Sequence, residues 1–555
     1  MKHLSYTRGR QDIPLLTRTI GSMLDETVAR FPDREALISL HQGLRFSWTE
    51  LAAEVDILAR ALMAIGLKTG DRFGIWMPNY AEWCFLQFAA AKVGIVLVNI
   101  NPAYRLSELE YTLKQSGCNW LVCVDTFRTS DYHAMLNQLV PELAETEPGA
   151  LFSETLPELR GIISFSTNPP SGFLSWASLL EFAEYTNPEA LRERQESLQF
   201  DDPINIQYTS GTTGFPKGAT LSHYNILNNG YMVGISLGLT ENDRMVIPVP
   251  LYHCFGMVMA NLACLSHGAT MIYPNASFDP LLTLDAVTKE KGTVLYGVPT
   301  MFIAELDHPQ RGDFDLSTLR TGIMAGSNCP IETMRRVIDE MHMKEVQIAY
   351  GMTETSPVST QTGPDDDLEL RVTTVGRTQP QLETKIIDED GRIVPRGEVG
   401  ELCTRGYSVM LGYWNDLGST REVIDAAHWM HTGDLGSMDE DGYVRIIGRS
   451  KDMIIRGGEN IYPREIEEFL ITHPDISEAH VVGVPDIKYG EEVVAWVRPR
   501  AGRALDEETL RLWCRERIAH FKVPRHFHFV KRFPMTVTGK AQKFRMRKIS
   551  KRSLR

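Results

Sequence analysis

The chain has 555 residues, enough material for several domains; 43% of them are hydrophobic and 23% are charged. This composition is typical of a globular protein and excludes a chain that is mainly disordered, collagen-like or of low complexity. The formal net charge of −14 argues against nucleic-acid binding as the main function, because most of the surface repels a polyanion. A local basic site for a phosphorylated ligand is compatible with that charge.

The cysteines and the apolar segments indicate the compartment. Eight cysteines are present and no two of them form a CxxC pair, so we expect buried or free thiols rather than disulfides or a structural zinc site. The N-terminus lacks the apolar run of a signal peptide, and the longest apolar stretch, residues 83–100, is interrupted by Gln87, Lys92 and Gly94. We therefore expect a cytoplasmic protein without a transmembrane segment.

The first 130 residues alternate between helical and strand patterns. A helix is expected from an N-cap at Thr49 to a stop at Gly66, and buried strands are expected at 73–77 and 119–125. The alternation resumes at Ile204 and continues to about residue 350. Strands that alternate with helices predict a parallel sheet with helices on its faces.

The pattern changes after about residue 370. Short strand-like runs are joined there by the turns 389–391 and 439–442, which predicts an antiparallel sheet or a small barrel. The last hundred residues read as a separable unit. Its expected elements are helices at 464–470 and 507–519 and strands at 479–483 and 493–497. The basic tail after Lys543 is interpreted as a solvated terminus.

The segment with the most specific composition is Tyr208–Gly218, YTSGTTGFPKG. Its hydroxyls and glycines form a loop whose N–H and O–H groups can surround phosphate oxygens, and Lys217 adds positive charge. It is not a Walker A loop, because Pro216 precedes the lysine and Gly218 follows it. A flexible surface loop is the alternative, and three threonines, one serine and three glycines in eleven residues argue against it.

This loop resembles the signature loop of the adenylate-forming superfamily, which includes acyl-CoA synthetases, peptide-synthetase adenylation domains and firefly luciferases. The other motifs of that family follow in order. They are Tyr252–Gly256 (YHCFG), Ala325–Asn328 (AGSN), Tyr350–Thr355 (YGMTET), Gly397–Leu402 (GEVGEL), Thr432–Asp434 (TGD), Gly448–Asp452 (GRSKD) and Thr538–Lys540 (TGK). The resemblance covers residues 20 to 545. Within the family, the chain is most similar to bacterial-type medium- and long-chain fatty-acyl-CoA synthetases.

The resemblance implies an α/β fold with two domains. A large N-terminal domain would combine two doubly wound α/β subdomains with a small distorted β-barrel, and a smaller, mobile α+β C-terminal domain would follow. Residues 1–449 would bind ATP and the acyl group, and residues 450–452 would be the hinge. Residues 453–555 would form the mobile domain that carries the catalytic lysine, Lys540.

For the nucleotide, the resemblance implies that Tyr350 stacks on adenine and that Asp434 holds the ribose together with Arg449. A carboxylate suits this role because it accepts hydrogen bonds from both ribose hydroxyls. The alternatives are a core aromatic residue at 350 and a turn-capping aspartate at 434. The residues predicted to bind ATP or CoA, or to serve the hinge, are Thr209, Ser210, Gly211, Thr212, Thr213, Gly214, Lys217, Gly326, Ser327, Asn328, Tyr350, Gly351, Asp434, Arg449, Lys451, Gly457 and Gly458.

Four residues are expected to act in catalysis by the same resemblance. Glu354 would hold Mg²⁺, a cation that prefers oxygen ligands, and Thr353 would contact the α-phosphate. Lys540 would stabilise the charge that develops at the α-phosphate and the acyl carboxylate. His253 would line the gate between the acyl pocket and the thiol tunnel. Without the family context these residues read as a helix start, a surface lysine and a core histidine.

The acyl pocket is expected from residues 296–302 and 322–325, which are rich in small and apolar side chains as an aliphatic chain requires. Ordinary core packing is the alternative for each of them. The residues predicted to contact the acyl substrate are Tyr252, Phe255, Val298, Gly322 and Ala325. Gly457 and Gly458 would line the channel for the pantetheine arm of CoA.

The predicted function is a fatty-acid–CoA ligase that uses ATP, Mg²⁺ and CoA. One alternative is an enzyme that activates a branched, aromatic or amino acid and delivers it to a carrier thiol. The segment Leu251–Phe255 lacks the carboxylate that pairs with a substrate α-amino group, which disfavours an amino acid. A second alternative, nucleotide binding without turnover, is disfavoured because Glu354 and Lys540 are both present. The expected partners are the acid, ATP and CoA, with no nucleic acid, and a homodimer is compatible with the sequence.

Overall fold

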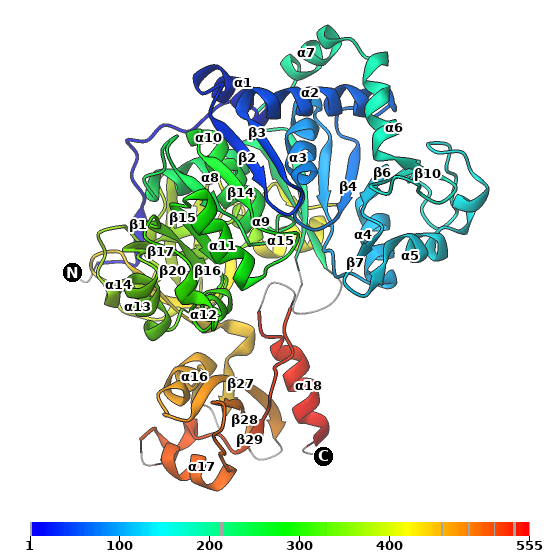
Figure 1. The fold of residues 1–555 in the computed structure, drawn as a ribbon. Coiled ribbons are helices and arrows are strands. Elements are labelled where there is room, and N and C mark those ends of the chain that lie inside the picture. The colour runs from blue at the N-terminus through cyan, green and yellow to red at the C-terminus, as the bar shows by residue number, and fades with distance from the viewer. Residues whose placement is uncertain are drawn as a thin grey trace. The chain divides into compact units, whose positions relative to one another are not determined.

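The computed structural model describes residues 3–209, 216–327, 329–456, 459–486, 489–515, 517–536 and 540–553. Helices and strands alternate through most of this length (Figure 1). The chain divides into two compact units. The larger unit contains Arg8–Thr384 and Thr404–Met430, and the smaller contains Met1–Thr7, Lys385–Cys403 and His431–Arg555.

The first sheet of the larger unit has eight strands in the order β10-β9-β6-β4-β5-β11-β12-β22. Neighbours from β10 to β11 pair in parallel, whereas β12 pairs antiparallel with β11 and β22. The strands are β10 (Phe173–Ser175), β9 (Gly161–Ser164), β6 (Trp120–Cys123), β4 (Arg72–Trp76), β5 (Val96–Asn99), β11 (Pro203–Thr209), β12 (Lys217–Ser222) and β22 (Gly412–Tyr413).

The second sheet has nine strands in the order β19-β18-β17-β16-β15-β13-β14-β2-β3. The central strands from β17 to β2 are parallel, and both edges are antiparallel. The strands are β19 (Arg377–Thr378), β18 (Val358–Gln361), β17 (Glu345–Gly351), β16 (Thr321–Ala325), β15 (Val294–Gly297), β13 (Arg244–Val246), β14 (Thr270–Tyr273), β2 (Glu35–Ser39) and β3 (Leu44–Ser47). The predicted parallel α/β organisation is confirmed.

Helices connect these strands and pack with them into one large apolar cluster and a second smaller one. The helices are α1 (Ile20–Arg30), α2 (Trp48–Ala64), α3 (Ala81–Val93), α4 (Leu106–Ser116), α5 (Tyr132–Leu139), α6 (Trp176–Glu181), α7 (Pro188–Glu196), α8 (His223–Ser236), α9 (Cys254–Gly256), α10 (Ala263–His267), α11 (Pro280–Glu290), α12 (Pro299–Leu306), α13 (Ile331–Glu340), α14 (Leu368–Thr373) and α15 (Leu417–Val423).

The start of α2 corrects one expectation. Its N-cap is Ser47 rather than Thr49, and Ser47 forms a capping box with Glu50. A serine that precedes a glutamate by three residues satisfies two terminal N–H groups at once, which a cap at Thr49 does not offer.

The longest apolar stretch of the sequence forms α3 and β5 in the core. Almost every residue of α3 is buried, as expected for a helix that is apolar on all sides. Its two buried long polar residues are paired: Gln87 donates to the Met257 carbonyl at 3.0 Å, and Lys92 lies 2.8 Å from Asp25 and 2.7 Å from Asp56. Among the residues that the structure describes, no helix is both long enough and apolar enough to cross a membrane.

Three further sheets are present in the described residues, and the smallest is the two-stranded pair β7 (Thr126–Phe127) and β8 (Ser130–Asp131). The small β structure expected after residue 370 is a five-stranded sheet in the order β1-β20-β21-β23-β24. Its strands are β1 (Tyr6–Arg8), β20 (Leu382–Ile387), β21 (Gly400–Gly406), β23 (Met430–Met438) and β24 (Val444–Arg449). The C-terminal sheet has the order β26-β25-β28-β27, with β29 beside β28. Its elements are β25 (Ile454–Arg456), β26 (Glu459–Ile461), β27 (Ile476–Asp486), β28 (Gly490–Pro499), β29 (His526–Phe529), α16 (Pro463–Ile471), α17 (Glu507–Arg515) and α18 (Lys543–Ser553).

One carboxyl group lies in the core of the larger unit without a partner. Glu305, on α12, is 1% exposed, and neither of its carboxyl oxygens has a hydrogen-bond partner among the described residues. Its buried neighbours on the same helix, Phe302 and Leu306, belong to the second apolar cluster. Burial raises the pKa of Glu305 well above its usual value, because the charged form cannot be solvated there.

This burial predicts a pH-dependent stability. The unfolded chain loses the Glu305 proton near its ordinary pKa of about 4.3, whereas the folded protein retains it to higher pH. The native state is therefore disfavoured increasingly as the pH rises above that value. We expect Glu305→Gln to raise the thermal unfolding midpoint relative to the wild type more at pH 8 than at pH 5.

The matched control is Glu369→Gln, which changes an exposed glutamate of α14. Its thermal unfolding midpoint should differ from that of the wild type by the same amount at pH 5 and at pH 8. A pH-independent offset for Glu305→Gln would show that its carboxyl group does not stay protonated in the folded protein.

Candidate active site

The predicted motifs of the larger unit follow the carboxyl ends of parallel strands. The segment Tyr252–Phe255 comes after β13, Val298 after β15, Gly326 after β16, and Thr353 after β17. β13 lies between β14 and β15, so the order of strands along the chain reverses there. The carboxyl ends of strands at such a reversal are the usual ligand site of a doubly wound sheet.

Glu354 connects this edge to the first sheet. It lies in the short 3₁₀ helix η5 (Thr353–Thr355) and is 5% exposed. Its Oε1 accepts a hydrogen bond from the Tyr413 hydroxyl at 2.8 Å and a weaker one from Thr209 Oγ1 at 3.4 Å. Its Oε2 has no protein donor within the described part of the chain. The carboxylate is thus fixed through one oxygen, which leaves the other for a cation, and the residue fits the predicted magnesium ligand.

Tyr413 is a site residue that the sequence did not indicate. It ends β22, which pairs with β12 through Tyr413 and Ala219. Burial, followed by the nearby charge of Glu354, raises the pKa of Tyr413, so the phenol stays protonated and donates to the carboxylate. The ammonium of Lys217 lies 5.1 Å from the centroid of the same ring. One aromatic side chain therefore orders both a predicted phosphate-binding lysine and a predicted metal ligand.

The signature loop itself lies largely outside the described residues. This applies to Ser210, Gly211, Thr212, Thr213 and Gly214. Its two ends are described: Thr209 ends β11, Lys217 begins β12, and the two residues are paired in the antiparallel register. The loop therefore starts and finishes beside Glu354 and Tyr413.

The segment that contains His253 contacts Thr353 through the side chain of Cys254. The Cys254 Sγ atom lies 3.8 Å from Thr353 Oγ1. His253 Nδ1 accepts a hydrogen bond from the Phe255 backbone amide at 3.1 Å, which caps α9. The ring of Phe255 packs against that of Tyr296 at 5.3 Å. The structure thus brings the segment that contains His253 and Thr353 to one edge of the sheet.

The predicted acyl-binding residues have mixed environments. The Tyr252 hydroxyl is buried without a hydrogen-bond partner among the described residues, and burial raises its pKa. Gly326 has φ +90, and a Cβ built there would lie 3.1 Å from Val298, so these two predicted residues adjoin. Ala325 is buried at the end of β16. A Cβ at Gly322 would lie 1.9 Å from the Leu295 carbonyl, so the pairing of β15 and β16 requires a glycine there.

The predicted adenine-binding segment ends β17. Gly351 follows Tyr350, and a Cβ at Gly351 would lie 1.7 Å from the Pro357 carbonyl oxygen, so the backbone turns back closely on itself there. Ser327 is exposed in the loop after β16. Asn328 lies outside the described residues.

The predicted ribose site lies in the smaller unit. Asp434 on β23 and Arg449 on β24 are direct partners in the antiparallel register, and Arg449 Nε lies 3.2 Å from Asp434 Oδ1. Asp434 is 8% exposed. Gly433 lies within β23 and has φ +69, a conformation that glycine adopts easily, so the strand backbone is irregular just before the carboxylate.

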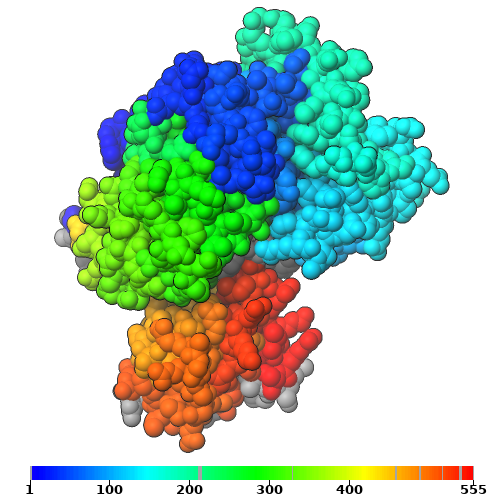
Figure 2. All heavy atoms as spheres, viewed as in Figure 1, coloured from blue at the N-terminus to red at the C-terminus, as the bar shows by residue number. Residues whose placement is uncertain are grey.

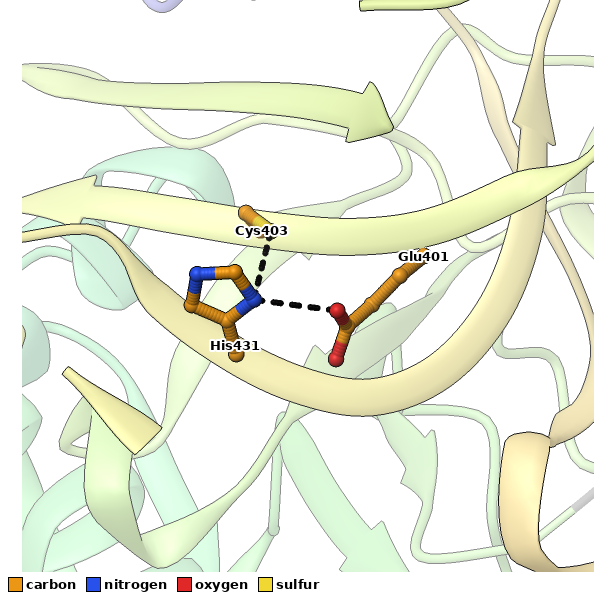
Figure 3. A group of neighbouring side chains, drawn as sticks. All are labelled: Glu401, Cys403 and His431. Carbon is orange, nitrogen blue, oxygen red and sulfur yellow. Dashed lines mark hydrogen bonds and ion pairs between the residues drawn. The ribbon is translucent and has the colours of Figure 1, made fainter. Parts of the chain in front are cut away.

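Glu401 lies beside His431 and Cys403, as Figure 3 shows, and also contacts the backbone before Asp434. Its Oε1 accepts a hydrogen bond from the Gly433 amide at 3.0 Å, and its Oε2 accepts one from His431 Nδ1 at 3.0 Å. Cys403 Sγ lies 3.7 Å from the same histidine nitrogen. The three side chains have the atoms of a metal site within 4.8 Å of one another, but hydrogen bonds already engage both carboxylate oxygens. We interpret the group as a support for the segment of β23 that carries Asp434.

The remaining predicted residues also lie in the smaller unit. Lys451 is exposed in η6 (Ser450–Asp452), the predicted hinge. Lys540 is exposed, and its amide donates to Thr536 Oγ1 at 2.9 Å while its carbonyl accepts from the Thr536 amide at 2.7 Å. Gly457 and Gly458 lie outside the described residues.

The Glu401 support predicts a measurable effect on nucleotide binding. Glu401→Ala removes the acceptor of the Gly433 amide and of His431, so the backbone before Asp434 loses this support. A charged hydrogen bond contributes about 1.5–3 kcal/mol, so AMP affinity measured by calorimetry should fall by about tenfold or more. Glu401→Gln keeps one acceptor oxygen and should lose less.

The matched control is Glu389→Ala, at an exposed turn of the same sheet, for which we expect wild-type affinity. Equal affinities of Glu401→Ala and the wild type would contradict the supporting role.

Comparisons with known proteins agree with this geometry. A family model described as AMP-binding enzyme matches residues 24–414, and one described as AMP-binding enzyme C-terminal domain matches residues 465–540. The chain is 49% identical over 534 residues to "Putative acyl-CoA synthetase YngI" of Bacillus subtilis (strain 168), covering 96% of this chain and 97% of the relative. It is 46% identical over 549 residues to the mitochondrial medium-chain acyl-CoA ligase ACSF2 of Rattus norvegicus, covering 98% of this chain and 89% of the relative.

Solved structures show the same fold. The crystal structure of the anthranilate CoA ligase AuaEII with anthranoyl-AMP has a TM-score of 0.83 at 25% identity and covers 98% of this chain and 99% of its own. ATP-bound MatB from Rhodopseudomonas palustris has a TM-score of 0.82 at 29% identity and covers 97% of this chain and 100% of its own. The predicted fold class, a large N-terminal α/β part followed by a smaller C-terminal domain, is confirmed. Together with the two matching family models, these findings establish that the chain belongs to the AMP-binding enzyme family.

Proposed function

We propose that the protein is an acyl-CoA synthetase that joins a medium- or long-chain fatty acid to CoA at the expense of ATP. The observation that carries the proposal is the group around Glu354: a buried carboxylate fixed by Tyr413 and Thr209 beside Lys217, at the ends of the signature loop. Family membership and relatives named as acyl-CoA synthetases support the same assignment.

In the first step a carboxylate oxygen of the acid attacks the α-phosphorus of ATP, and pyrophosphate leaves. This chemistry needs positioning and charge neutralisation more than covalent help from the protein. We assign Lys217 to the phosphates and Glu354, with Thr209 and Tyr413 behind it, to Mg²⁺, which neutralises phosphate charge when it is bound. Thr353 would contact the α-phosphate, and Lys540 would approach the carboxylate and the α-phosphate.

In the second step the CoA thiol attacks the carbonyl carbon of the acyl-AMP, and AMP leaves. Asp434 and Arg449 would keep the ribose in place through both steps, supported by Glu401. His253 would line the gate between the acyl pocket and the thiol path. We propose that residues 453–555 rotate about a hinge at 450–452, centred on Lys451, so that Lys540 serves the first step and Gly457–Gly458 the second.

The acid class follows from the apolar surroundings and from the relatives. Phe255, Val298 and Ala325 are buried and apolar, as a saturated chain requires. Several relatives carry the name medium-chain acyl-CoA ligase. The alternative is a branched, aromatic or amino acid delivered to a carrier thiol, and the segment 251–255 offers no carboxylate for an amino group. No disulfide joins any of the eight cysteines in the described residues, which supports the proposal of a reducing, cytoplasmic location.

The decisive experiment measures AMP release from MgATP and CoA with a panel of acids from acetate to palmitate, together with benzoate, a branched acid and several amino acids. CoA-dependent turnover that peaks among the aliphatic acids is expected. Pyrophosphate exchange with an amino acid and no CoA turnover would replace the proposal with the carrier-loading alternative.

Lys540→Ala should separate the two steps. Loss of a preorganised cation where negative charge develops should lower the rate of acyl-AMP formation by about 10²–10³-fold. The thioester-forming step, measured with supplied acyl-AMP and CoA, should keep most of its rate. Lys344→Ala, at an exposed lysine of the larger unit, is the control and should leave both steps unchanged. Equal loss of both steps would refute this assignment of Lys540.

Glu354→Gln should act through magnesium. The amide keeps the size of the side chain and can still accept from Tyr413, but it lacks the charge that a hard cation prefers. The Mg²⁺ concentration needed for half-maximal acyl-AMP formation should rise by about tenfold or more, the loss expected when a charged ligand is removed. Tyr413→Phe should give a smaller rise. An unchanged Mg²⁺ dependence in Glu354→Gln would contradict the metal-binding role.

A further inference from the structure

The charge of the chain is unevenly distributed along its length. Residues 517–555 contain thirteen lysines and arginines and no aspartate or glutamate, although the whole chain has a net charge of −14. Residues 1–516 therefore have a net charge of −27. A concentrated positive segment in an acidic protein is an electrostatic signal for an anionic partner.

The helix α18 presents one face of this segment to solvent. Its inner face packs through Met546 and Ser550, both fully buried, and Ser550 Oγ accepts a hydrogen bond from the Trp496 indole at 2.9 Å. Away from these contacts, two large apolar side chains are exposed: Phe544 by 56% and Ile549 by 45%. The C-terminal segment, red in Figure 2, lies at the surface of its domain.

The cations of α18 fall into two groups. Two of them form ion pairs within the domain: Lys543 Nζ lies 2.6 Å from Glu467 Oε1, and Arg547 Nη2 lies 3.3 Å from Asp452 Oδ1. The others are exposed and form no ion pair within the described part of the chain. We define the basic face as these four cations and the two exposed apolar residues: Phe544, Arg545, Lys548, Ile549, Lys551 and Arg552.

Two more exposed cations lie on the neighbouring segment. Lys531 and Arg532 follow β29, and the chain after them runs beside the start of α18, where the Gln542 amide donates to the Pro534 carbonyl at 2.8 Å. At the other end of the helix, Ser553 Oγ lies 3.4 Å from His528 Nε2 of β29. Contacts at both ends of α18 therefore fix the helix on the C-terminal sheet, and the loop after β29 adds the two cations Lys531 and Arg532 nearby.

We propose that the basic face docks the protein on an anionic membrane surface. Cations alone would fit any polyanion, but large apolar side chains beside them fit a lipid surface, where they enter the boundary between headgroups and acyl chains. The acidic remainder of the chain disfavours wrapping by a nucleic acid, which would contact more than one face. Docking of this kind is peripheral and reversible, because one short helix supplies it.

Cosedimentation with vesicles tests the proposal on the full-length protein and needs no catalytic activity. One vesicle contains phosphatidylcholine alone, and the other contains equal parts phosphatidylcholine and phosphatidylglycerol. We expect the wild type to bind the anionic vesicle and not the neutral one, and to dissociate as salt is raised. The variant Arg545→Gln/Lys548→Gln/Lys551→Gln/Arg552→Gln should bind at least about tenfold more weakly. Phe544→Ser/Ile549→Ser should bind the anionic vesicle more weakly than the wild type and should dissociate at a lower salt concentration.

The matched control removes four exposed cations elsewhere, as Arg8→Gln/Lys68→Gln/Lys344→Gln/Arg445→Gln, and should bind like the wild type. None of these substitutions touches Met546 or Ser550, so unchanged thermal unfolding is expected and is measured alongside. Failure of the wild type to bind anionic vesicles overturns the proposal. Equal loss in the matched control also overturns it, because binding would then depend on total charge. Capture of an RNA by the wild type, without vesicle binding, would assign the face to a nucleic acid instead.

Discussion

The hydrogen bond between the Tyr413 hydroxyl and the Glu354 carboxylate is the contact on which the site of the larger unit depends. Glu354 lies in the connection from β17 to β18 of the nine-stranded sheet, whereas Tyr413 ends the eight-stranded sheet. Both groups are buried, so the bond forms where an unpaired carboxylate would be costly. One charged group therefore fixes the edges of two sheets to each other and faces the same loop ends that are expected to hold the phosphates.

Much of the fold could be predicted from the sequence because its elements have simple patterns. The strands expected at 73–77 and 119–125 are β4 and β6, and the helix at 464–470 is α16. The ends of the helices were predicted less accurately. The helix expected to reach residue 519 is α17, Glu507–Arg515, and the N-cap of α2 is Ser47 rather than Thr49. Helix ends depend on single hydrogen bonds, which periodicity does not reveal.

The candidate site was predictable only where its residues form contiguous motifs. Glu354 and Asp434 stand in short, specific segments, whereas Tyr413 and Glu401 act through partners that are distant in sequence. Tyr413 reaches Glu354, 59 residues away, because β22 adds to the edge of β12, and no spacing rule encodes that pairing. Glu401 lies in the GEVGEL motif, but its role needs the pairing of β21 with β23 beside Gly433. Long-range pairing, rather than composition, creates these contacts.

The close packing at Gly322 limits how the range of acids can evolve. A side chain there would meet the Leu295 carbonyl, so a larger residue would part β15 from β16 before it shortened any pocket. Val298 is constrained differently, because a Cβ at Gly326 would meet a methyl group of Val298 rather than a backbone atom. At the proposed acyl contacts, variation in acid length should therefore accumulate at Val298, while Gly322 stays fixed for a reason unrelated to the substrate.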